Sequence, residues 1–189
     1  MITDEDLRML DHATATFEQI LTTDGALGDL PSRCAGWSTR DVANHVLGGA
    51  IRYTHYFTGG SGDDVAWTRT ADHAGDDAVA VHRTLCAALR DEFVAHRDDA
   101  DLALHHPIRD VDVVTLLVLR VQELVLHGWD IASVTAPGTE LDPDLCRYLL
   151  DRGAPVRAML RDGGKLGAAL TPDGDGPAAA VLAEWGRQR

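Results

Sequence analysis

The segment VQELVLHGWD at residues 121 to 130 places a carboxylate and an imidazole one helical turn apart within an apolar run. Helical residues four apart are rotated by about 40° and have Cβ atoms ~5–6 Å apart, so Glu123 and His127 can reach one ion. His45 lies on the apolar side of a second predicted helix and supplies a third ligand if the two helices face each other. Two imidazoles and a carboxylate with an open fourth position suit catalytic zinc, or non-haem iron when two or three positions are open.

Structural interpretations of the same residues remain open. A single histidine on an apolar face is more often a hydrogen-bonded core residue than a ligand, and a Glu–His pair on an exposed helix face is usually solvated. Burial favours the metal, because a buried glutamate must be paired, protonated or bound to an ion. The turn is surrounded by apolar residues: Leu119, Val121, Leu124, Val125 and Leu126. The spacing alone leaves a metal site and a structural cluster about equally favoured.

Five further residues are candidates for secondary roles. Arg120 is expected to point inward, where it suits a carboxylate of a thiol or substrate or forms a structural salt bridge. Arg52 is a second anion-binding candidate, although a surface position also fits. Trp37 and Trp129 either wall the pocket or simply pack at helix ends. Asp130 either orients a ligand histidine or accepts backbone N–H groups.

Four further histidines are expected to play no part in this site. They share no face with the three proposed ligands, so we expect them to be exposed or to cap helices: His55, His82, His105 and His106.

Composition indicates one soluble domain with a real core, because 45% of the 189 residues are hydrophobic and 25% are charged. The net charge of −13, from 17 Lys+Arg against 30 Asp+Glu, comes without any basic stripe. Nucleic acids are therefore not expected as partners. No apolar stretch is long enough for a membrane span, and a homodimer is compatible with the sequence without being indicated by it.

The three cysteines, Cys34, Cys86 and Cys146, are an odd number without CxxC spacing. This pattern is typical of free thiols in a reducing compartment and favours a cytoplasmic location.

Apolar residues recur at helical intervals along most of the chain, which predicts an all-α protein built as a helical bundle. The segment 59 to 64 and the following stretch with Trp67 are expected to be loop, and short strands around 166 to 170 are left open. The helix that opens at Asp142 must bend or stop near Gly153 and Pro155. The other predicted helices cover residues 4–22, 38–57, 76–97, 111–134 and 178–185. We expect the bundle to occupy 1–162 and a C-terminal extension, packed on it, to occupy 163–189.

Two motifs resemble those of the DinB-like, mycothiol-dependent maleylpyruvate isomerase family. LPSRCAGWSTRDVANHVLGG at 30 to 49 is similar to its first motif, and RVQELVLHGWDIA at 120 to 132 is similar to its second, Glu-x-x-x-His-Gly-Trp-Asp. The closing LAEWGRQR resembles an ending common in an actinobacterial branch. The first motif departs from the family by an extra residue between Pro31 and Cys34, so no role is carried over to that cysteine.

The resemblance implies a four-helix bundle in which His45, Glu123 and His127 bind zinc or a similar divalent ion. It also implies mycothiol as a thiol cosubstrate. An ion with an open position lowers the pKa of a thiol, so we expect a metal-dependent mycothiol S-transferase or isomerase in which metal-bound thiolate adds to an electrophilic small molecule. Two rivals remain: a hydrolase that uses metal-activated water, and a non-catalytic small-molecule-binding protein.

Overall fold

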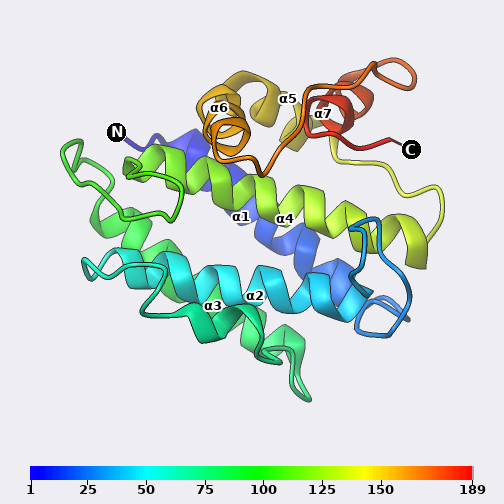
Figure 1. The fold of residues 1–189 in the computed structure, drawn as a ribbon, viewed down its shortest axis with the longest axis horizontal. Helices are drawn as coiled ribbons and strands as arrows, with labels where there is room; N and C mark the ends of the chain where they lie inside the picture. Colours follow the sequence, from blue (N-terminus) through cyan, green and yellow to red (C-terminus); the bar gives the residue numbers. More distant parts are fainter. Residues whose placement is uncertain (189) are drawn as a thin grey trace.

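The computed structural model describes residues 1–188 and is all-α, which confirms the predicted fold class. In the described part of the chain four long α-helices form the bundle and there are three short α-helices; the short helices lie along one side of the bundle (Figure 1). Within the described chain there are only isolated β-bridges, so the short strands considered around 166 to 170 are absent. The long helices are α1 (Asp4–Leu21), α2 (Thr39–Tyr56), α3 (Ala78–Ala95) and α4 (Val113–Thr135). The short helices are α5 (Pro143–Arg152), α6 (Ala154–Asp162) and α7 (Pro177–Glu184).

Local signals place the helix ends close to the predicted positions. The Ser38 hydroxyl accepts a hydrogen bond from the backbone N–H of Asp41, whose carboxylate accepts one from the Ser38 backbone, which makes a complete capping box for α2. Asp142 caps α5 ahead of a proline at its first position. The predicted interruption at Gly153 separates α5 from α6.

Helix α4 is apolar nearly all round because other helices surround it. It contacts α1 and α2 within the bundle and α5 and α6 of the short helices (Figure 1). Glu123 and Arg120 are therefore buried charges in the most enclosed element of the protein. A buried carboxylate and a buried guanidinium each require a hydrogen-bonding or oppositely charged partner. The partners of both groups lie at the face of α4 that is turned toward α2.

Two expectations about the α2–α3 region were wrong. The stretch around Trp67 is not a plain loop but contains a 3-10 helix, η1 (Ala66–Arg69), which packs on α2. On α3 the buried face includes His82, which is fully buried and whose Nε2 lies 3.0 Å from the Thr14 carbonyl oxygen. That histidine is a hydrogen-bonded core residue rather than an exposed or capping one.

No helix among residues 1–188 combines the length and the apolar character that crossing a bilayer requires. All three cysteines are free thiols, as their spacing predicted.

Candidate functional site

The structure brings His45, Glu123 and His127 together between α2 and α4. The Nε2 atom of His45 lies 3.7 Å from Oε1 of Glu123, and the rings of His45 and His127 meet edge to face with centroids 5.0 Å apart. All three line one cavity of about 550 Å³, which we call the site cavity. The two helices therefore face each other at the residues whose spacing suggested a metal.

Helix α2 approaches Glu123 closely because Gly49 has no side chain. A Cβ atom at Gly49 would lie 3.0 Å from Oε2 of Glu123 and 3.3 Å from Nη1 of Arg120. The carboxylate is also held from its own helix, because Nη1 of Arg120 donates to Oε2 at 3.4 Å. Oε1 is left to face His45.

The charge states of the site follow from burial and neighbours. Burial by itself raises the pKa of Glu123, but electrostatic interactions with His45 and with the guanidinium groups of Arg120 and Arg52 outweigh it and hold the pKa below its ordinary value. Burial lowers the pKa of His45 to about 4, against the opposing effect of Glu123. A carboxylate beside a neutral imidazole is the protonation state that metal ligation requires.

One ring nitrogen of His127 contacts Asp130. Its Nδ1 lies 3.0 Å from Oδ2 of Asp130, which leaves Nε2 as the ring nitrogen not engaged by this contact. Arg187 donates from Nε to Oδ1 at 2.8 Å and from its terminal nitrogen to Oδ2 at 2.6 Å. Burial raises the pKa of Asp130, yet the bonds from Arg187 and His127 bring it far below its ordinary value. Asp130 is thus a fixed anion that holds the imidazole in place.

Among the described residues, the set of three candidate ligands whose ligand atoms already lie close enough together to hold one ion contains Cys34 and the same histidine. The ligand atoms of Cys34, His127 and Asp130 all lie within 4.8 Å of one another. Burial first, and then the charge of Asp130, raises the pKa of the Cys34 thiol to about 12, and the thiol donates to Oδ2 of Asp130 at 3.1 Å. The two groups differ in how their carboxylates are engaged, since Asp130 is already paired with Arg187 whereas Oε1 of Glu123 faces His45.

The site cavity is rich in cationic groups, although the protein as a whole is strongly acidic. Among the described residues that line it, Glu123 is the one carboxylate. Arg52, which was expected to fit the surface, is instead buried and donates to Thr68 Oγ1 at 3.1 Å and to the carbonyl oxygen of His45 at 3.4 Å. The cationic lining residues are Arg52, Arg69, Lys165 and Arg187.

Arg120 does not line the site cavity. It is buried in the core, where it donates to the Val46 carbonyl oxygen at 2.9 Å and contacts Glu123 and the Cys86 sulfur. These contacts match the structural salt bridge that was considered for it.

The two tryptophans of the motifs lie in different places. Trp37 lines the site cavity, with its ring centroid 5.0 Å from that of His45. Trp129 lines a separate apolar groove between α1, α4 and α5, and the Arg33 guanidinium lies over its ring. An aromatic residue that the sequence did not indicate, Trp185, lines the site cavity instead.

Sequence reasoning also missed residues contributed by connecting segments. His106, expected to be exposed or capping, lines the site cavity, and burial lowers the pKa of its imidazole. Lys165 and Arg187 come from beyond α6, where no periodicity indicated that they would face α4. The Gly-Arg ending of the chain was the one available signal for Arg187.

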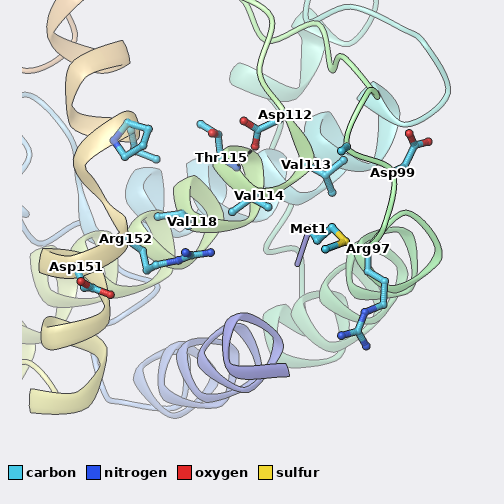
Figure 2. A pocket seen from close by; sticks show the side chains of 13 residues that line it. Met1, Arg97, Asp99, Asp112, Val113, Val114, Thr115, Val118, Asp151 and Arg152 are labelled. Carbon is cyan, nitrogen blue, oxygen red and sulfur yellow. Dashed lines mark hydrogen bonds between the residues drawn. The ribbon is translucent and has the colours of Figure 1, made fainter. Parts of the chain in front are cut away.

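A different cavity, of about 400 Å³, lies at the start of α4 and is shown in Figure 2. Met1, Arg97, Val113 and Arg152 are among the side chains that surround it (Figure 2). Its two arginines are paired with acids of α1, Arg97 with Asp4 and Arg152 with Asp6. It contains none of the candidate site residues, so the functional site is not placed there.

Comparison with known proteins finds a matching family model, two relatives and similar solved structures. Residues 10–132 match the family model of the mycothiol maleylpyruvate isomerase N-terminal domain. Two uncharacterized proteins of Mycobacterium tuberculosis, MT0763 from strain CDC 1551 and Rv0738 from strain H37Rv, are each 27% identical over 130 residues. These matches cover 69% of this chain and 65% of each relative, so the chain spans just under two thirds of the relatives' length.

Among solved structures, the fold is similar to that of a mycothiol-dependent maleylpyruvate isomerase and to a histidine-to-alanine mutant of that enzyme. In each case the TM-score is 0.59 with 20% identity, over 79% of this chain and 68% of the other. Because the family model matches well over half of the residues, the chain belongs to the mycothiol maleylpyruvate isomerase N-terminal domain family, the DinB-like family that its motifs resemble.

Proposed function

We propose that this protein is a metal-dependent mycothiol S-transferase or isomerase that acts on an anionic electrophile. The observation that carries the proposal is the convergence of His45, Glu123 and His127, from two helices, on one cavity. Family membership supports mycothiol as the thiol.

The residues fit a divalent ion, and their donor set suits zinc. Two ligands of a tetrahedral ion with bonds of ~2 Å lie roughly 3.4 Å apart, close to the 3.7 Å between His45 and Glu123. When bound, such an ion supplies Lewis acidity that lowers the pKa of a thiol in its open position. The carboxylate of Asp130 holds the His127 ring, and Arg120 holds Glu123, so the ligands are preorganised.

The chain's own residues would bind and orient the electrophile. Arg52 and Lys165 form no ion pair with a carboxylate in the described part of the chain, and both line the site cavity. A carboxylate group on the electrophile would neutralise them and place the adjacent carbon near His45 and Glu123. For transfer to an activated alkene, the thiol gives up its proton and its sulfur bonds to one alkene carbon as the C=C π bond breaks, and the carbanion formed at the other carbon takes up a proton. For isomerisation, the same bond breaks again after rotation, and the thiol is released.

The proposal also places the reaction in the cytoplasm, a reducing compartment. Three free cysteines and a thiol cosubstrate are both consistent with that environment.

The proposal is tested by assaying zinc-loaded protein with a carboxylate-bearing activated alkene, with and without mycothiol. We expect consumption of the alkene that depends on mycothiol and is lost in His45→Ala. Turnover of a hydrolysable analogue that ignores the thiol would favour a metal-dependent hydrolase instead. Tight ligand binding without turnover, unchanged in His45→Ala, would favour a non-catalytic binding protein.

A further inference from the structure

A second cavity adjoins the site cavity at His45. It has a volume of about 540 Å³ and lies between the loop before α2, the first turns of α2 and the segment that follows η1. Trp37, His45 and Arg69 line both cavities. We call this second space the polar chamber. A ligand in either space can therefore reach the histidine of the proposed metal site.

The polar chamber differs from the site cavity in charge. Its ionic side chains are two arginines and two aspartates. Arg40 and Asp72 are paired at 2.6 Å, and Asp41 is engaged by the Ser38 cap. The chamber is therefore close to neutral, whereas the site cavity has four cationic groups against Glu123.

Its walls are also polar and held in place. The side-chain oxygen of Asn44 accepts hydrogen bonds from the backbone N–H groups of His73 and Ala74, each at 2.8 Å. This fixes the segment after η1 against α2. Trp37 is the one aromatic residue of the chamber and remains 38% exposed. A preformed polar space with a single exposed indole suits a polyhydroxylated ring, whose hydroxyls bond to the walls while its C–H face packs on the indole.

We propose that the polar chamber binds the uncharged sugar part of the thiol cosubstrate, with Trp37 as its platform, while the anionic electrophile occupies the site cavity. This assignment rests on the proposed function. Mycothiol is a cysteine derivative of an uncharged pseudodisaccharide, so its sulfur would extend past Trp37 toward His45. The opposite arrangement would bury Arg52 and Lys165 beneath a neutral ligand and place an anion beside Asp41 and Asp72, at an electrostatic cost in both spaces.

The test uses S-methyl mycothiol, a thioether that cannot become a thiolate and so reports sugar binding without chemistry. Calorimetric titration of the metal-loaded protein should show binding that weakens about tenfold in Trp37→Ala, as expected for loss of an aromatic contact. Trp37→Phe should retain most of the affinity. Trp67→Ala is the matched control, because Trp67 is also exposed but lines neither space.

Steady-state kinetics provide a second test of the sugar site. In Trp37→Ala the KM for mycothiol should rise about tenfold, while the KM for N-acetylcysteinamide, a thiol that is also uncharged but lacks the sugar, should not change. Lys165→Met should raise the KM for the anionic electrophile and leave the Kd of S-methyl mycothiol unchanged.

The assignment is overturned if Trp37→Ala binds S-methyl mycothiol as well as the unaltered protein does, if Lys165→Met is the variant that loses it, or if the unaltered protein does not bind it. Binding that depends on Trp37 in a protein without thiol-dependent turnover would support the sugar site and refute the proposed function, so the two failures are distinguishable.

Discussion

At the scale of single residues, His127 depends on a chain of contacts that begins near the end of the protein. Arg187 pairs with Asp130, and Asp130 holds Nδ1 of His127. Glu123 is held in a similar way by Arg120. The two carboxylates therefore differ in their contacts. Glu123 faces His45 directly, whereas Asp130 contacts the ring of His127.

Asp130→Asn tests that positioning role. The amide keeps the size of the side chain but loses the charge that fixes the Nδ1 proton on His127. Loss of such a partner typically weakens metal binding by roughly 10–100-fold. Competition with a fluorescent zinc chelator measures the change, and circular dichroism checks that the variant is folded. Unchanged zinc affinity would show that Asp130 does not orient a ligand.

At the scale of helices, the site depends on how closely α2 approaches α4. Gly48 and Gly49 lie where α2 meets η1 and α4, and a Cβ at Gly48 would be 2.5 Å from the Thr68 carbonyl oxygen. The Ser38 capping box sets where α2 begins and therefore which face carries His45. Small residues on α2 and a fixed start together determine the distance between His45 and Glu123.

Gly49→Ala is expected to disturb this contact. In an unobstructed helix interior the change would stabilise the protein by about 1 kcal/mol, but here overpacking costs about 1–3 kcal/mol. We expect the unfolding temperature of the metal-free protein to fall and zinc affinity to drop roughly tenfold because Glu123 is displaced. Gly167→Ala is the matched control, since a Cβ there meets nothing within 4 Å. A rise in unfolding temperature in Gly49→Ala would mean that α2 and α4 are not tightly packed at this point.

The sequence predicted these elements well where the signals are local. Capping residues and apolar spacing determined α1, α2 and α4, and the four-residue spacing placed Glu123 and His127 on one face. On α3 the apolar spacing indicates a stripe from Val81 and Leu85 to Leu89 and Phe93. Leu89 and Phe93 are buried as that spacing indicates, but the first half of the helix buries His82 and Cys86 instead of Val81 and Leu85. Histidine and cysteine do not count as apolar residues in a hydrophobicity pattern. The spacing of the apolar residues in the first half of α3 therefore predicts that a neighbouring face of the helix is buried.

At the scale of the whole molecule, the short C-terminal helices both cover the bundle and complete the site. Trp185 and Arg187 line the site cavity from beyond α7. Their positions depend on contacts between segments far apart in the chain, which no local pattern encodes, so they could not be predicted from spacing. His106 and Lys165, also outside the helices, were missed for the same reason.

Asp6 ties α1 to α5 across this interface. The buried carboxylate accepts hydrogen bonds from the Tyr148 hydroxyl at 2.8 Å and from Arg152 at 3.1 Å, in addition to its capping bonds from Thr3. We expect Asp6→Ala to lower the free energy of unfolding by about 2–3 kcal/mol, measured by urea denaturation. Tyr148→Phe removes one bond and should cost about 1 kcal/mol. A loss below that of Tyr148→Phe would show that the carboxylate is not a structural anchor.

The same group predicts how stability depends on pH. Burial raises the pKa of Asp6, but the bonds from Thr3 and Tyr148 and the charge of Arg152 lower it below its ordinary value overall. The stabilisation is therefore present above the pKa of the unfolded chain, about 4, and is lost as pH falls through the lower folded value. Urea unfolding between pH 6 and pH 3 should show a steeper loss for the unaltered protein than for Asp6→Asn. Parallel curves would contradict this assignment.

The central claim is that His45, Glu123 and His127 bind one divalent ion. Elemental analysis of protein purified after growth with zinc tests it most directly. The account predicts about one equivalent per chain, lost in His45→Ala and retained in Cys34→Ser. Metal that survives in His45→Ala but disappears in Cys34→Ser would place the ion on Cys34, His127 and Asp130 and contradict the account.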